Sequence, residues 1–205
     1  GSTLKDATLL VHNSTFNVYD KNLLISAGRL NAMVKNNVFT DSDISLAKND
    51  GLNVVESNEF HNCIVKAEDG VTFQYNKMYP GDQTYVYSIR PDNFAGTVNA
   101  SNNYWGSDNP DFSVLIDKSR APNGSVDYFP YYSDVALSTL IYKMVTISED
   151  TVWATPHPNQ KVTILDGATL TLSAPMSLDT VTMREGAQVK SNLADQTGSV
   201  TTKSL

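Results

Sequence analysis

The chain has 205 residues, of which 40% are hydrophobic, so it is long enough to bury the core of one or two domains. Its formal net charge of −7 and its lack of a basic stripe argue against nucleic acid as a partner and against an anionic membrane surface. The longest apolar run, around residues 135–147, is interrupted by polar side chains and is too short to span a bilayer, so we expect no membrane insertion.

The first predicted elements are short strands in an internal repeat. Five segments each carry an apolar residue, a polar residue, Asn or Ser, and a closing apolar or aromatic residue. They are VHNSTF (11–16), VKNNVF (34–39), VESNEF (55–60), FQYNKM (73–78) and NASNNYW (99–105). The irregular period of roughly 20 residues, without helical signals, is typical of the coils of a β-solenoid.

Asparagine recurs at one position of this repeat. Two residues before the closing residue the chain has Ser14 in the first copy and then Asn37, Asn58, Asn76 and Asn103. Successive coils of a solenoid lie about 4.8 Å apart, so equivalent residues stack. Asparagine tolerates left-handed backbone angles in turns, and its amide can bond the equivalent amide in the next coil. We therefore predict a structural ladder of these four asparagines.

A second series of strands fits between the repeats, at LLISAG (23–28), ISLAKNDG (44–51) and IVKAEDG (64–70), each ending in a glycine turn. The longest excursion, residues 79–96, is predicted to emerge on one face as an insertion. It contains the predicted ligand-binding residues Tyr85, Tyr87 and Arg90, since aromatic rings stack on sugars and Arg can meet a carboxylate or sulfate. The alternative is that the two tyrosines are strand residues packed on the solenoid.

A plainer repeat follows. VTISEDTVW (145–153), VTILDGATLTL (162–172) and VTMREGAQVK (181–190) share Val-Thr, an apolar residue, a polar turn and a second strand. Two of the turns are acidic-glycine pairs, Asp166-Gly167 and Glu185-Gly186. This pattern predicts a smaller β-strand-repeat module over residues 135–205, or a solenoid that continues from the first part.

The segment between the two repeats, NNYWGSDNPD followed by GSVDYFPYYSD, resembles the pattern N-x-W-W-G … G-x-V-D-Y-x-P-W. That pattern commonly ends the right-handed parallel β-helix of bacterial surface and secreted proteins, in the broad pectate-lyase-like superfamily. The resemblance implies a right-handed parallel β-helix over residues 1–134. Tyr104, Trp105 and Tyr128 would form its aromatic cap, and residues 126–131 its terminal strand. Ligand binding by this aromatic segment is the alternative.

Many β-helix proteins that this chain resembles cleave or epimerise acidic polysaccharides, which requires positioned acids and bases. The Asn-Thr-Asp, Asp-Asp, His-Gly and Arg-x-Lys set of polygalacturonases is missing, and so is the Asp-Pro-His-Glu run of alginate epimerases. His12 and His61 fit surface positions of the solenoid, and His157 between two prolines fits a loop. We therefore predict no catalytic residues, and interpret the lone Cys63 as a small buried filler.

The histidines and the cysteine also lack the spacing of a zinc site, so we predict no metal ligands and no cofactor. The one segment that suggests Ca²⁺ is SDNPD, through Asp108, Asn109 and Asp111, and it lacks the spacing and bidentate Glu of an EF-hand.

The sequence thus predicts an all-β fold, a β-helix followed by a smaller strand-repeat module. The functional hypothesis is a non-catalytic, extracellular fragment of a larger bacterial surface protein. It would act as an adhesin or rigid display stalk whose partner is a glycan or a host surface protein. One alternative is a fragment of a carbohydrate-active enzyme, a lyase, hydrolase or epimerase on acidic polysaccharide. Another is a piece of a phage tail fibre, which would be trimeric.

Overall fold

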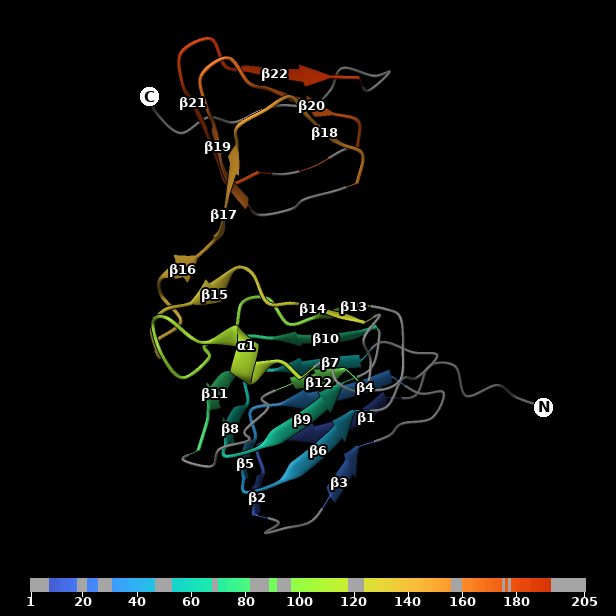
Figure 1. Cartoon of the computed structure of the whole chain (residues 1–205). Helices are drawn as coiled ribbons and strands as arrows, with labels where there is room; N and C mark the ends of the chain where they lie inside the picture. Colours follow the sequence, from blue (N-terminus) through green and yellow to red (C-terminus); the bar gives the residue numbers. More distant parts are fainter. Residues whose placement is uncertain are drawn as a thin grey trace, which may run out of the picture. The chain divides into compact units, whose positions relative to one another are not determined.

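The computed structural model describes residues 8–17, 22–25, 31–46, 53–67, 70–81, 89–91, 97–117, 124–155, 160–174, 176 and 178–192. The chain is nearly all β, with 54% strand and 3% helix, which confirms the predicted fold class. Parallel sheets stack as a β-solenoid of about 7 turns (Figure 1). The chain divides into two compact units, Gly1–Leu140 and Ile141–Leu205.

The first unit is built from three parallel sheets that run along the solenoid. The first sheet contains β1 (Thr8–His12), β4 (Asn31–Lys35), β7 (Asn53–Glu56), β10 (Val71–Gln74), β13 (Thr97–Asn99) and β14 (Ser125–Asp127). The second contains β2 (Thr15–Asn17), β5 (Val38–Thr40), β8 (Glu59–His61) and β11 (Lys77–Tyr79). The third contains β3 (Asn22–Ile25), β6 (Asp43–Leu46), β9 (Ile64–Ala67) and β12 (Ile89–Pro91). Each of the first four coils contributes one strand to each sheet, and the first sheet continues with β13 and β14 of the following coils.

The core of this unit comes from every second residue of each strand. In β4 the side chains of Ala32 and Val34 are buried, while the residues between them are half-buried. The in-register pairing places Phe16, Phe39 and Phe60 above one another, and adjacent ring centroids are 4.9 and 5.0 Å apart with nearly parallel planes. The period-2 alternation and the one-coil register together therefore fill the interior with a continuous column of like side chains.

The last coil of the first unit departs from this pattern. β14 pairs with β13 through Asn99↔Asp127, and a bridge joins Tyr104 to Tyr132, so Tyr131 stands at the position that Asn103 holds in the coil before. The segment predicted as one terminal strand, 126–131, is divided. β14 ends at Asp127, the Phe129–Pro130 peptide is cis, and β15 (Tyr131–Tyr132) pairs with β16 (Leu140–Ile141).

A single short helix, α1 (Phe112–Leu115), is described before this last coil. The Asp111 side chain caps it by accepting a bond from the backbone N–H of Ser113 at 3.0 Å. No helix within the described residues is long and apolar enough to cross a membrane.

The second unit has two three-stranded parallel sheets. One contains β17 (Lys143–Ile147), β19 (Gln160–Ile164) and β21 (Thr180–Met183), and the other contains β18 (Thr151–Trp153), β20 (Thr169–Leu172) and β22 (Gln188–Ser191). Its core is a cluster around Trp153, Ile164 and Leu170. Here too the strands repeat in parallel register, as in Ile147↔Ile164↔Met183.

One finding differs from the sequence prediction of an insertion at 79–96. Tyr79 is the last residue of β11, and Ile89–Pro91 forms β12, which pairs with β9. Part of this segment therefore continues the third sheet. β12 lies at the edge of that sheet, where the missing N–H of Pro91 is tolerated.

Candidate functional site

The corner between the first and second sheets is a two-residue turn repeated in successive coils. Its first residue has a positive φ in five coils, at Asn13 (52°), Asn36 (54°), Ser57 (58°), Tyr75 (57°) and Asn102 (57°). The ladder residue follows it directly. The left-handed conformation is therefore adopted by the residue before each ladder asparagine and not by the ladder asparagine itself.

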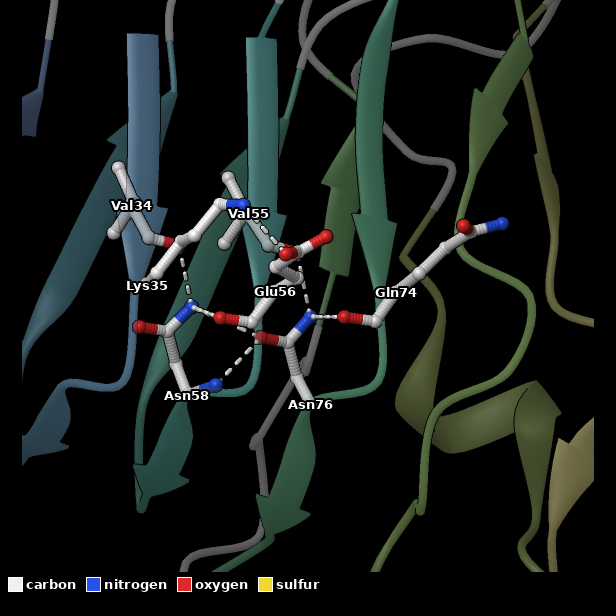
Figure 2. A network of polar contacts seen from close by, with 7 residues as sticks. All are labelled: Val34, Lys35, Val55, Glu56, Asn58, Gln74 and Asn76. Atoms are coloured by element: carbon white, nitrogen blue, oxygen red, sulfur yellow. Dashed lines mark hydrogen bonds and ion pairs between the residues drawn. The ribbon is translucent and has the colours of Figure 1, made fainter. Parts of the chain in front are cut away.

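The structure places Asn37, Asn58, Asn76 and Asn103 in one buried stack, each at most 1% exposed. Asn58 is representative (Figure 2). Its Nδ2 donates to the carbonyls of Val34 (2.9 Å) and Glu56 (3.0 Å) and to Oδ1 of Asn76 (3.0 Å). Its Oδ1 accepts bonds from both the backbone N–H and Nδ2 of Asn37, at 2.9 and 3.0 Å. One amide thus satisfies donors and acceptors in three consecutive coils, so direct hydrogen bonds between protein groups fix the corner.

The ladder ends differently in the first and last coils. Ser14, in the first described coil, donates its backbone N–H to Asn37 Oδ1 at 3.0 Å, and its hydroxyl donates to the carbonyl of His12 at 3.0 Å. In the last coil Tyr131 takes the ladder position and is buried, and its hydroxyl donates to the carbonyl of Asp108 at 3.4 Å. An aromatic side chain therefore covers the amide stack at this end.

Aromatic packing supports that covering. Phe112 of α1 stacks on Tyr128 with ring centroids 3.8 Å apart and also meets Trp105 and Tyr131 edge-on, at 5.6 and 5.3 Å. Trp105 is 1% exposed. The predicted cap residues Tyr104, Trp105 and Tyr128 thus lie around the last coil, with Phe112 as an additional member that the sequence did not single out.

Among the described residues of the first unit, a group of half-buried aromatic and charged side chains lies on the outer face of the second sheet. It consists of Glu59 and His61 of β8, Lys77 and Tyr79 of β11, and Tyr104, and we call it the tyrosine surface. The His61 and Tyr79 rings stack with centroids 4.5 Å apart and planes 11° apart. The Tyr104 ring meets Tyr79 at 6.1 Å and 66°. The inner faces of the same strands carry the buried Phe60 and Met78, so the strands separate core from surface by alternation.

The charges on the tyrosine surface compensate one another. Lys77 Nζ lies 3.3 Å from Glu59 Oε1, and His61 Nε2 lies 3.4 Å from Glu59 Oε2. Partial burial, with smaller contributions from the Glu59 carboxylate and Tyr104, raises the pKa of the Tyr79 hydroxyl above its ordinary value. That hydroxyl therefore remains protonated and able to donate a hydrogen bond over the physiological pH range.

A second corner borders the tyrosine surface. The Asn62 amide donates to Asp41 Oδ1 at 2.6 Å, and both residues have positive φ. At the next coil the equivalent turn contains Gly81, where an added Cβ would collide with the side chain of Asn62. The turn at this corner is thus a tightly packed edge of the surface.

Of the three residues predicted to bind a ligand, Tyr85 and Tyr87 lie outside the described residues. Arg90 lies on β12, at the register position beside Lys66 of β9. The pairing therefore brings two cationic residue types to neighbouring positions of the third sheet. Because β9 and β12 are separated by the long segment between them, only the strand register could place these two positions together.

The other candidate residues are also located. Asp111 is engaged as the cap of α1, and Asp108 and Asn109 precede it in an exposed segment. Cys63 is buried. His12 is exposed, and His157 lies outside the described residues. No group of three or more His, Cys, Asp or Glu side chains that could hold a metal occurs in the described part of the chain.

Sequence reasoning did not identify Glu59, His61 and Lys77 as neighbours of Tyr79. The signal was present in the repeat, since these residues directly flank the closing residues Phe60 and Met78. Aligning the repeats places these residues at outward positions, but the contacts between their side chains follow from the strand register of the folded coils.

Comparisons of the chain with protein-family models, with curated proteins and with solved structures find no match. The fold itself defines the class of the protein, which is a parallel β-solenoid with a buried asparagine ladder.

Proposed function

We propose that this chain is a non-catalytic, extracellular part of a bacterial surface protein of the pectate-lyase-like superfamily, acting as an adhesin or rigid display stalk for a glycan or host surface protein. The observation that supports this most is the ladder of Asn37, Asn58, Asn76 and Asn103, because it ties consecutive coils into one stack. Side chains on the outer faces are then held at a regular spacing, which suits an extended contact with a partner.

The experiment is to present the purified chain to a glycan array and to cultured host cells, and to measure retained protein by fluorescence. Saturable binding to a defined glycan or to cells is the expected result. A variant with Arg90→Ala tests the predicted insertion residues, with Lys143→Ala in the second unit as an exposed cationic control. If the chain binds neither glycans nor cells, the adhesin role is contradicted.

A second candidate function has one specific observation in its favour. Lys66 and Arg90 occupy paired positions on adjacent coils of the third sheet. Cations clustered across coils are what a lyase or hydrolase acting on acidic polysaccharide would need to bind its substrate. The assay is to incubate the chain with polygalacturonate and with alginate and to follow unsaturated and reducing ends. Product formation that Lys66→Ala abolishes would assign an enzyme; the adhesin proposal expects none.

The tail-fibre alternative makes a different prediction, because it requires a trimer. Light scattering coupled to size exclusion gives the mass of the particle in solution. The adhesin proposal expects the mass of a single chain, 22.4 kDa, and a threefold mass would favour the fibre.

A further inference from the structure

The tyrosine surface carries an inference that deepens, and rests on, the proposed function. Its five side chains lie on the outward positions of strands whose inward positions are already filled by Phe60, Met78 and Trp105. The core of the solenoid therefore does not require rings on the outside. Cross-strand ring pairs add only a modest stabilisation on a sheet surface. Stability alone therefore does not account for the three rings of His61, Tyr79 and Tyr104 in consecutive coils.

The geometry of the rings defines what the surface presents. Because His61 and Tyr79 stack face to face along the coil axis, their edges and polar atoms point away from the stack. Tyr104 is turned by 66° relative to Tyr79, so the two rings form a corner and not a flat wall. The Tyr79 ring thus lies between His61 and Tyr104, and the corner presents apolar ring edges together with phenolic hydroxyl groups. A sugar, which has C–H faces and hydroxyl edges, matches both properties.

The charge of the surface selects among sugars. Glu59 lies between Lys77 at 3.3 Å and His61 at 3.4 Å, so the one described cation of the surface is already paired with a carboxylate. The whole chain carries a net charge of −7. An acidic polymer would meet this carboxylate and the negative field of the chain, whereas a neutral polymer loses little on approach.

The repeat of the surface also favours an extended ligand. Neighbouring coils are spaced about 4.8 Å apart, and the tyrosine surface continues over three of them. One monosaccharide of an extended chain has a comparable length, so successive sugars can meet equivalent positions in successive coils. We propose that the tyrosine surface binds an extended neutral saccharide along the coil axis, with Tyr79 at its centre.

The test uses the full chain and isothermal titration with neutral oligosaccharides of β-linked glucose, mannose and galactose, and with polygalacturonate and alginate oligosaccharides for comparison. Tyr79→Ala is the variant. Tyr75→Ala is the matched control, since Tyr75 is the same residue type in the same coil, is 42% exposed and lies at the opposite corner of the second sheet. Circular dichroism and tryptophan fluorescence establish that both variants fold.

The expected result is binding of a neutral oligosaccharide that weakens at least about tenfold in Tyr79→Ala and is unchanged in Tyr75→Ala. Tyr79→Phe, which keeps the ring and removes the hydroxyl, should give an intermediate loss. Saccharide binding that Tyr79→Ala leaves intact, or that is confined to acidic oligosaccharides, overturns this inference and leaves the proposed function standing. No binding to any saccharide, together with retention on host cells, overturns the inference and makes the partner a protein. No binding to saccharides or cells overturns both.

Discussion

Each of the two units is a stack of parallel strands, and the two stacks have different kinds of corner. In the first unit the corner contains a left-handed residue followed by a buried asparagine, as in Ser57-Asn58. In the second unit the corner is an exposed acidic-glycine turn, as at Asp166-Gly167, where Gly167 has φ +73°. Its bonds are mainly between backbones, such as Gly167 N–H to the carbonyl of Glu185 at 3.0 Å.

This difference shows two ways to satisfy the polar groups at a solenoid corner. A buried corner removes water, so its backbone groups need side-chain partners, and the amide supplies a donor and an acceptor in one side chain. In an exposed corner the backbone polar groups can bond water. Glycine is then needed only because it adopts the positive φ of the turn. We therefore expect the first unit to lose more stability than the second when a corner residue is changed.

Two tryptophans allow the units to be followed separately. The chain contains only two, Trp105 in the first unit and Trp153 in the second, and both are buried. In a Trp153→Phe background the emission of Trp105 reports the first unit during urea unfolding. A Trp105→Phe background reports the second unit through Trp153. The predictions below are changes in the free energy of unfolding measured in these backgrounds.

The largest expected effect comes from the aromatic column of the first unit. Phe39 is completely buried and lies between the rings of Phe16 and Phe60. Phe39→Ala should lower the stability of the first unit by about 3–5 kcal/mol, because it removes apolar burial and leaves a cavity. Phe16→Ala is the control; Phe16 is half-buried at the end of the column, and its loss should be clearly smaller. Equal losses in the two variants would show that the column is not packed as described.

The second largest loss of stability is expected from a change in the asparagine ladder. Asn58→Leu keeps the volume of the side chain but removes the partner of Asn37 and leaves the Val34 carbonyl without its amide donor. Stranding several buried polar groups should cost on the order of 3 kcal/mol in the Trp105 signal. Asn36→Gly, at the exposed residue before the ladder, should change little. A stable Asn58→Leu protein would mean that the amide stack contributes no net stability.

The corner of the second unit should be less sensitive. Gly167→Ala meets no atom within 4 Å, so its cost is confined to the left-handed backbone, about 1–2 kcal/mol. Gly167→Asn should lose less, since asparagine visits this conformation more readily than alanine does. Urea unfolding followed by Trp153 emission measures both. If Gly167→Ala costs as much as Asn58→Leu, the proposed contrast between buried and exposed corners is wrong.

The smallest expected effect is a gain. Tyr75 has a left-handed conformation, φ 57°, that bulky residues adopt at a cost, and it is exposed. Tyr75→Asn should stabilise the first unit by about 0.5–1 kcal/mol, because asparagine occupies this region with less strain. Thr72→Asn, which places the same residue in a strand of that coil, should bring no gain. A loss of stability in Tyr75→Asn would indicate that the Tyr75 ring makes contacts of its own.

The repeat alone predicted much of the fold. The period of roughly 20 residues, the closing Phe39 and Phe60, and the alternation within strands all follow from the requirement that each coil bury the same positions. Equivalent residues of a parallel stack must lie above one another, so the positions of Asn37, Asn58, Asn76 and Asn103 in one column could be read from spacing. These features follow from the sequence pattern alone.

Other features are decided only by the tertiary structure. The return of Ile89–Pro91 to the third sheet depends on pairing with β9 across a long segment, which no local pattern specifies. Tyr131 at the ladder position follows from the register of the last coil.

The tyrosine surface belongs to the second group. Its residues are ordinary in sequence, and it exists because strand register brings Glu59 of β8 beside Lys77 and Tyr79 of β11 on one outer face. The sequence by itself thus determined which residues each coil buries, since burial follows from alternation and repeat. The tertiary structure decided which exposed residues meet, because contacts between coils depend on the register and on the length of each excursion.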